Sequence, residues 1–441
     1  MGEFKKPINE KEFHENFAQI KPLMDNNQAF YESSRCLFCY DAPCIAACPT
    51  EIDIPLFIRQ INSNNLKGAA KTIFDSNWMG NACGKVCPTE VLCEGACVYN
   101  HQDVKPIEIG RLQNYATRSA IDKNQSLFDL PELKNKKVAI IGAGPAGISC
   151  ACELRMAGYT SDIFEAHEKP SGLNMYGVAP YKITNQEAAL EVDYLKEQFG
   201  FSIHYNRRVT SEEDLEELEN TYNAIFIGIG LGSTRKINIK NENLKGCFGA
   251  TEFIEKLRVN EYAEDSLGKR VIVLGGGNTA MDAASESARM GAEEVTIAYR
   301  NSKDSMRAYD FEYELAKEVG VKGVFNCNPI EIIGSEKVEG VRFVKTKSEG
   351  GSLEAIEGSE FIITCDTVIF ATGQSKQKEF LDQIDKLELD KRGRIVVNEN
   401  FQTGNPKYFA AGDAVNGGAE VVNAAAEGKK AAVGIVRFLE S

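Results

Sequence analysis

Two segments of this chain share one pattern: a β-branched strand runs into a glycine turn, which is followed by a helix and a second strand. The first segment reads "KKVAIIGAGPAGISCACELRMAGYTSDIFEA" and the second "GKRVIVLGGGNTAMDAASESARMGAEEVTIAYR". Strand, glycine turn, helix and strand in this order are typical of a parallel α/β unit. A chain of 441 residues is also too long for one core. The sequence therefore predicts an α/β protein with two Rossmann-like domains.

The first glycine turn has the spacing of a dinucleotide site. Gly142, Gly144 and Gly147 form G-x-G-x-x-G directly after the strand. The first glycine allows the tight turn, the second lets a pyrophosphate approach the backbone, and the third lets helix and strand pack closely. Glu165 ends the next strand, where a carboxylate binds ribose hydroxyls. We therefore expect a dinucleotide here.

A short motif near the C-terminus indicates which dinucleotide this is. "FAAGDA" resembles the second flavin motif of flavoproteins with two dinucleotide-binding domains, and places Gly412 and Asp413 on it. The alternative is a turn with a solvated aspartate. Together with the first turn, the motif favours FAD. The tail that follows ends in an expected helix, which should pack on the first Rossmann unit.

The second glycine turn differs from the first in the charge beside it. It contains Gly276 and Gly277, and Ala280 replaces the third glycine. The next strand ends at Arg300, with Arg307 soon after, instead of at an acid. Arginine suits the 2′-phosphate of NADP, whereas a carboxylate would repel it. The alternative is a pair of solvated arginines at the end of a strand.

Charge and hydropathy exclude several classes of partner. The net charge of -14 argues against nucleic acid, because phosphate binding needs a basic face. No stretch approaches eighteen apolar residues, and the N-terminus has no apolar leader. We expect a cytoplasmic protein with no membrane span. Because thiols stay reduced in that compartment, clustered cysteines there indicate metal binding.

Eight of the thirteen cysteines lie in two runs between residues 36 and 97, C-x2-C-x4-C-x3-C-P and C-x3-C-P-x4-C-x3-C. Zinc is the competing interpretation. Proline after Cys48 and Cys87 is typical of ferredoxin-type runs, and a neighbouring flavin gives iron–sulfur clusters a role. We therefore predict two [4Fe–4S] clusters with ligands exchanged between the runs. The remaining cysteines are expected to be small buried side chains: Cys150, Cys152, Cys247, Cys327 and Cys365.

With these motifs, the whole chain resembles the N-terminal half of dihydropyrimidine dehydrogenase and the corresponding bacterial subunit, and more broadly the glutamate synthase small-subunit family. The resemblance implies a first cluster held by Cys36, Cys39, Cys44 and Cys97. It implies a second held by Cys48, Cys87, Cys93 and Gln113, the glutamine lying in "IGRLQNYAT". The resemblance implies that relatives of the glutamate synthase type typically carry glutamate at that position. Cys83 is left without a predicted metal.

The resemblance also implies the remaining site residues, and the pattern along the chain, with helical spacing up to residue 125, predicts the domain order. For FAD these add Pro145, Ala146, Leu173, Lys182 and Val209, and for NAD(P) they add Asn278, Thr279, Ala371, Thr372 and Gly373. The expected domains are a helical iron–sulfur domain (1–127), a first FAD part (128–245), an NAD(P)H domain (246–370) and a second FAD part (371–441).

The expected function is electron input. Hydride from NAD(P)H would pass to FAD, and electrons would then pass through both clusters to an FMN- and iron–sulfur-containing partner that reduces uracil or thymine. Arg300–Asn301 stands where the animal enzyme has Arg–Lys, so NADH and NADPH both stay open. Two alternatives remain: a subunit of glutamate synthase or of an electron-bifurcating transhydrogenase, and a zinc-stabilised scaffold without redox activity.

Overall fold

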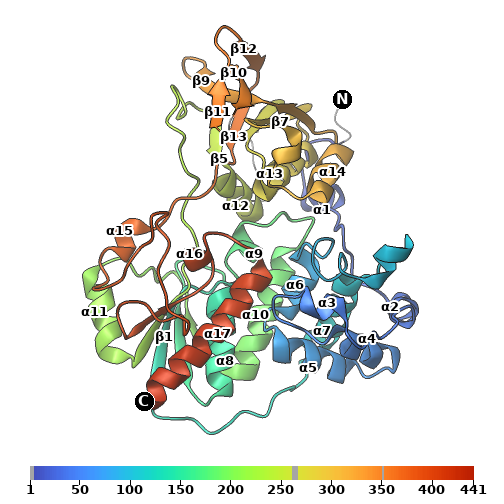
Figure 1. Ribbon diagram of the computed structural model, residues 1–441, viewed down its shortest axis with the longest axis vertical. Helices are drawn as coiled ribbons and strands as arrows, with labels where there is room; N and C mark the ends of the chain where they lie inside the picture. The colour runs from blue at the N-terminus through green and yellow to red at the C-terminus, as the bar shows by residue number, and fades with distance from the viewer. Residues whose placement is uncertain (1–3, 261–266, 350–351) are drawn as a thin grey trace. The chain divides into compact units, whose positions relative to one another are not determined.

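The structure is a computed structural model, and it describes residues 4–260, 267–349 and 352–441 (Figure 1). The chain divides into two compact units. The first consists of Met1–Gln19, Tyr176–Tyr181 and Gly232–Ser375, and the second of Ile20–Met175, Lys182–Leu231 and Lys376–Ser441. The domain boundaries expected from the sequence stay predictions.

The second unit begins with a set of short helices, drawn in blue in Figure 1. They are α2 (Asn26–Ser34), α3 (Pro43–Ala46), α4 (Ile54–Asn62), α5 (Leu66–Ser76), α6 (Gly80–Val86), the 3-10 helix η1 (Val98–Gln102) and α7 (Ile109–Asp122). In α4, Ile54, Phe57, Ile58 and Ile61 are buried at helical spacing. They join a core with Leu112 and Ala116 of α7. This segment is helical, as the sequence predicted.

A five-stranded parallel sheet follows in the same unit, with the order β14-β4-β1-β2-β3. Its strands are β1 (Lys137–Ile141), β2 (Thr160–Phe164), β3 (Ser202–His204), β4 (Ala224–Ile227) and β14 (Tyr408–Ala410). Its helices are α8 (Pro145–Met156), α9 (Leu173–Tyr176), α10 (Asn185–Phe199), α11 (Glu212–Thr221), α15 (Lys378–Leu381), α16 (Asp413–Asn416) and α17 (Val421–Glu440). β1 and β4 are continuous apolar runs, as expected of strands covered on both faces.

The C-terminal helix α17 packs along α8, the helix after the first glycine turn. Gly428 makes this possible, because a Cβ there would lie 2.1 Å from the carbonyl oxygen of Ala146. The predicted return of the tail to the first Rossmann unit is therefore confirmed.

The first unit contains a second five-stranded parallel sheet, with the order β5-β13-β6-β7-β8. Its strands are β5 (Cys247–Gly249), β6 (Arg270–Leu274), β7 (Glu294–Tyr299), β8 (Lys322–Phe325) and β13 (Thr367–Phe370). Its helices are α1 (Glu10–Asn16), α12 (Ala250–Asn260), α13 (Asn278–Arg289), the 3-10 helix η3 (Lys303–Ser305) and α14 (Asp310–Glu318). An antiparallel sheet is inserted before β13, made of β9 (Cys327–Ile333), β10 (Gly340–Glu349), β11 (Ser352–Ala355) and β12 (Phe361–Thr364).

The chain crosses between the units several times, and the longest stretch of the first unit begins after Leu231 and ends at Ser375. The two crossing segments pair with each other: Ser375 N donates to the Ser233 carbonyl at 2.8 Å and Gly232 N donates to the Ser375 carbonyl at 2.9 Å. Thr234 and Gln374 form an antiparallel bridge beside them. None of the helices in the described ranges combines the length and hydrophobicity needed to cross a lipid bilayer.

Candidate functional site

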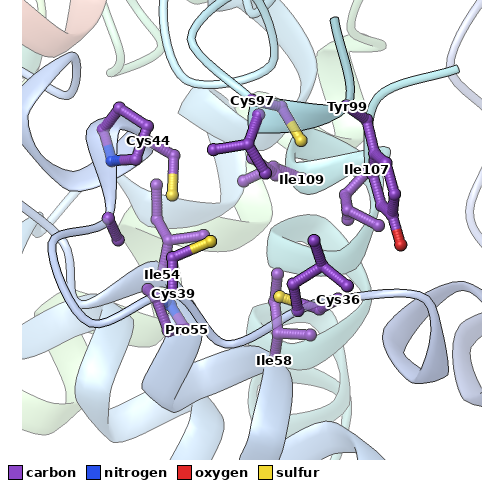
Figure 2. Close-up of a pocket in the computed structure, with 14 residues that line it drawn as sticks. Cys36, Cys39, Cys44, Ile54, Pro55, Ile58, Cys97, Tyr99, Ile107 and Ile109 are labelled. Carbon is purple, nitrogen blue, oxygen red and sulfur yellow. The ribbon is translucent and has the colours of Figure 1, made fainter. Parts of the chain in front are cut away.

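Four cysteines from distant parts of the helical segment line one pocket. Cys36, Cys39 and Cys44 come from the loop before α3 and from α3 itself, and Cys97 directly precedes η1. Figure 2 shows their sulfur atoms pointing into the same space. Apolar side chains close the rest of it, including Ile54, Ile58, Ile107 and Ile109. The structure thus brings together the four residues predicted for the first cluster.

The four thiols line a cavity and do not converge on one point where a single metal ion would sit. Among the described residues, no group of three or more His, Cys, Asp or Glu is arranged to hold one metal ion. Burial, followed by the charge of Cys36, raises the pKa of Cys44 to about 12. A metal ion must therefore displace the thiol protons when it binds. A pocket walled by four sulfurs and by aliphatic side chains fits a polynuclear iron–sulfur group.

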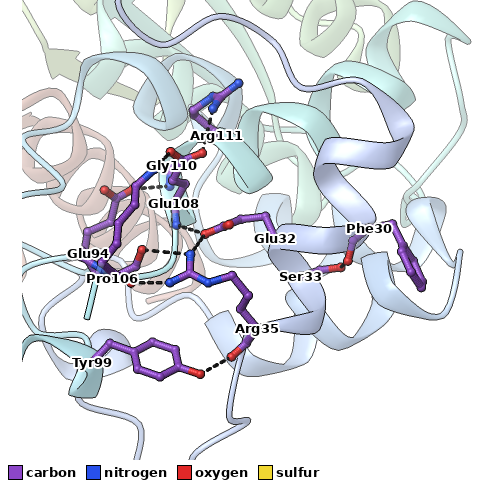
Figure 3. A network of polar contacts seen from close by, with 11 residues as sticks. Phe30, Glu32, Ser33, Arg35, Glu94, Tyr99, Pro106, Glu108, Gly110 and Arg111 are labelled. Carbon is purple, nitrogen blue, oxygen red and sulfur yellow. Dashed lines mark hydrogen bonds and ion pairs between the residues drawn. The ribbon is translucent and has the colours of Figure 1, made fainter. Parts of the chain in front are cut away.

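A polar network ties together the two segments that carry the first and last of these cysteines (Figure 3). Arg35 Nη1 lies 2.7 Å from Glu32 Oε1, and Tyr99 Oη donates to the Arg35 carbonyl at 2.7 Å. Glu32 Oε1 also accepts from the Glu108 amide at 2.9 Å. Arg35 and Tyr99 were not predicted, because nothing in the sequence spacing indicates this long-range contact. These contacts fix the segment before Cys36 relative to the segment after Cys97.

The second group of cysteines is more deeply enclosed. Cys93 is buried, and the nearby Cys48 thiolate adds to the rise in its pKa after burial and the charge of Glu94. A hydrogen bond with Cys83, and then burial, raises the pKa of Cys87 well above its ordinary value. Cys48, Cys87 and Cys93 are therefore neighbours, as predicted. Cys83, which the sequence left unassigned, lies beside them and is a second candidate for a fourth ligand.

Gln113 is buried on α7, close to α6. Its Nε2 donates to the Gly80 carbonyl at 2.7 Å. Within the described part of the chain, no donor reaches its Oε1. The bond to Gly80 fixes the orientation of the amide and leaves its oxygen without a donor among the described residues, and the ligand role of Gln113 stays a prediction.

The first glycine turn is closed by the predicted acid. Glu165 Oε2 accepts from the Ala143 amide in the turn at 2.8 Å, and Oε1 accepts from the His167 amide at 2.8 Å. Burial alone would raise the pKa of Glu165, but the bonds from His167 and Ala143 outweigh it and lower the pKa. The carboxylate thus stays charged beside the turn, at the place expected for ribose. His167 was not predicted, although it stands only two residues after the acid.

The remaining flavin positions lie in the same unit. Gly412 has φ 73°, and its amide donates to Glu427 Oε2 at 2.8 Å. Asp413 Oδ1 accepts from the Ala419 amide at 3.1 Å, and burial raises the pKa of this carboxyl. Pro145 and Ala146 begin α8, and Leu173 begins α9. Lys182 and Val209 are buried, and Val209 packs within the core of the sheet.

The second glycine turn leaves its flanking arginines unpaired. Gly277 caps α13, whose first residues are Asn278 and Thr279, and the Gly276 carbonyl accepts from the Arg307 amide at 2.9 Å. The side chains of Arg300 and Arg307 are exposed, and neither guanidinium has a polar partner within the described residues. Two free cations beside a dinucleotide turn suit a phosphate.

Two further sets of predicted residues can be located in the structure. Ala371, Thr372 and Gly373 directly follow β13, and the Ala371 amide donates to the Leu274 carbonyl beside the turn. Of the five isolated cysteines, four are buried as predicted, but Cys247 is only partly buried. The expectation was wrong there because β5 is an edge strand of its sheet and one side stays open.

Residues 136–428 match the family of pyridine nucleotide-disulphide oxidoreductases. The chain belongs to this family. Residues 13–125 of this oxidoreductase match the dihydropyrimidine dehydrogenase domain II, 4Fe-4S cluster, family. FAD, NAD(P)H and 4Fe–4S clusters are therefore its cofactors. It is an NAD(P)H-dependent flavin and iron–sulfur oxidoreductase of the electron-input kind.

Individual relatives cover nearly all of this oxidoreductase. It is 35% identical to the glutamate synthase [NADPH] small chain of Escherichia coli strain K12, over 99% of this chain and 96% of the relative. It is 33% identical to the NAD-dependent dihydropyrimidine dehydrogenase subunit PreT of the same strain, over 96% and 97%. Mycobacterium tuberculosis FprA in complex with NADPH shares the fold, with a TM-score of 0.60 at 20% identity over 70% of this chain and 85% of FprA.

Proposed function

We propose that this chain is the electron-input subunit of a dihydropyrimidine dehydrogenase-type complex, working with an FMN- and iron–sulfur-containing partner that reduces uracil or thymine. The observation that supports this most strongly is the pocket into which Cys36, Cys39, Cys44 and Cys97 all point, in a chain that also carries two dinucleotide turns. When bound, the flavin would take hydride from NAD(P)H and release single electrons to the iron–sulfur groups.

The residues of the chain would bind and orient these groups. Glu165 and the glycine turn would hold the FAD ribose and pyrophosphate, and Asp413 would hold the opposite part of the same cofactor. Arg300 and Arg307 would bind the nucleotide in the other unit. Cys48, Cys87 and Cys93 with Gln113 would hold a second cluster, Cys83 being the alternative fourth ligand.

A glutamate synthase small subunit is the second candidate, because the small chain from Escherichia coli is as similar to this protein as PreT is. Gln113 favours the dehydrogenase type, since the family resemblance implies that relatives of the glutamate synthase type typically carry glutamate there. The buried, oriented amide of Gln113 supports that interpretation.

The test has two stages. Anaerobically purified protein should contain about one FAD and eight irons per chain, as two four-iron clusters require. Iron near zero with bound zinc would refute the iron–sulfur assignment. Affinity capture of the native complex, followed by assays for uracil reduction and for glutamate formation, would then separate the two partners. Glutamate formation alone would overturn the dehydrogenase proposal.

A further inference from the structure

A buried lysine lies on the helix that leads to the second cysteine group. Lys85 is in α6, between Cys83 and the C-cap Cys87, and its side chain is only 1% exposed. Burying a charge of this kind is costly unless the charge is paired. Cys83 and Cys87 are four residues apart and share one face of α6, whereas Lys85 points to another face. Its partner must therefore come from elsewhere.

One partner is an acid on the flavin side of the same unit. Glu187 Oε1 lies 2.9 Å from Lys85 Nζ. Glu187 is in the first turn of α10, and its other oxygen accepts from the amide and the hydroxyl of Thr184 at 3.0 Å. Hydrogen bonds from Thr184 at the start of α10 therefore fix the Glu187 carboxylate that pairs with Lys85.

A second acid of α10 holds the start of α6. Glu191 is fully buried, and its two oxygens accept from the Asn81 amide at 2.6 Å and the Ala82 amide at 3.0 Å. The helix that carries Cys83 and ends on Cys87 is therefore attached to α10 at both ends. Lys85 cannot move away from the cysteine group without breaking these contacts.

We propose that Lys85 raises the reduction potential of the iron–sulfur group held by Cys87, and that Glu187 limits this effect. Opposite faces of one helix are roughly 10 Å apart, and a charge in a dry interior is felt at that distance. A cation favours the reduced, more negative cluster, and an anion disfavours it. This inference rests on the proposed second cluster.

The test is an EPR-monitored redox titration of the anaerobic holoprotein and of three variants. Lys85→Met keeps the length of the side chain and removes the charge, so the cluster should become harder to reduce. Glu187→Gln keeps an oxygen for Thr184 and removes the anion, so the cluster should become easier to reduce. We expect about a tenfold change in the reduced-to-oxidised ratio in each direction, or 59 mV for a one-electron couple. The double variant should return close to the parent.

Controls distinguish charge from packing. The exposed pair Lys71 and Asp75, on α5 of the same helical segment, should leave the potential unchanged as Lys71→Met or Asp75→Asn. Lys85→Arg should keep the parent potential. Shifts of Lys85→Met and Glu187→Gln in the same direction, or none, would overturn the inference, since loosened packing has no reason to give opposite signs. If Lys85→Met loses the cluster, Glu187→Gln must still raise the potential. Absence of the second cluster from the parent protein would instead refute the proposed function.

Discussion

The two dinucleotide turns have the same backbone plan and opposite chemistry. The turn of the flavin sheet is closed by a buried carboxylate, and Glu165 binds the turn itself through the Ala143 amide. The turn of the other sheet has no acid and is flanked by exposed arginines that are unpaired within the described residues. The first acid is therefore part of the fold as well as of the site, whereas Arg300 and Arg307 are available only to a ligand. Substitutions should damage the two turns in different ways.

The largest difference is expected for the glycines. A Cβ on Gly147, the third glycine of the first turn, would lie 2.0 Å from the Gly142 carbonyl oxygen, and the second turn already has Ala280 at that position. A Cβ on Gly277, the second glycine of the other turn, would have no neighbour within 4 Å. Gly147→Ala should cost about 1–3 kcal/mol of stability or more, because the backbone must shift, and FAD should be lost. Gly277→Ala should leave the unfolding transition near that of the parent. Thermal unfolding measures the stability of each variant, and the flavin content per chain measures its FAD. Equal losses of stability in Gly147→Ala and Gly277→Ala would show that the two turns do not differ in this way.

Substitution of Glu165 should have the second-largest effect. Glu165→Ala leaves the Ala143 and His167 amides without their acceptor, at a cost of about 1–3 kcal/mol. FAD retention should fall with stability. Glu168→Ala, an exposed acid three residues on, is the matched control and should change neither. Chemical denaturation with parallel flavin fluorescence gives both readings. A Glu165→Ala protein with parental stability would show that the acid serves only the ligand.

Arg300 should affect coenzyme choice alone. Charge-assisted bonds to a phosphate are worth roughly 1.5–3 kcal/mol, so Arg300→Ala should weaken the binding of NADPH about tenfold or more. The binding of NADH should be nearly unaffected, because NADH has no 2′-phosphate. The unfolding transition should also stay in place, because the guanidinium is exposed and has no polar partner in the described part of the chain. Steady-state reduction of an artificial acceptor with each coenzyme measures this, with exposed Arg392→Ala as control. Equal weakening of both coenzymes would mean that Arg300 does not read the 2′-phosphate.

The smallest effect should be on the way stability depends on pH. The pKa of Glu165 is lowered in the folded protein, so its contribution to stability is present above the ordinary carboxyl pKa and is lost as pH falls through the folded value. Glu165→Gln should flatten this part of the stability profile below about pH 4.5. Arg300→Ala should not, because arginine does not titrate there. Parallel profiles for parent and Glu165→Gln would contradict the assigned shift.

Local patterns explain why so much of the fold could be predicted. Glycine turns and the acid at the end of the next strand depend on neighbours in sequence, so the sequence alone was enough to place Gly142, Glu165 and Gly276. Contacts between distant segments could not be predicted in this way. Nothing in the spacing indicates that Arg35 meets Tyr99, or that Lys85 meets an acid of α10, because these pairs exist only after helices pack. The ferredoxin-type spacing predicted that the two cysteine runs exchange ligands, but only the family resemblance implied that Cys97 is the residue that joins the first run.

The paired crossing segments have a consequence for how such a chain can be built. Because Gly232 and Ser375 are hydrogen-bonded to each other, residues 232–375 enter and leave at a single point. Ends this close can be joined by a tight turn of the kind that closes a β-hairpin. Exchange of this stretch for another would therefore leave the ends of the flavin sheet in place, but it would also have to replace the partners that Met1–Gln19 and Tyr176–Tyr181 find in the same unit.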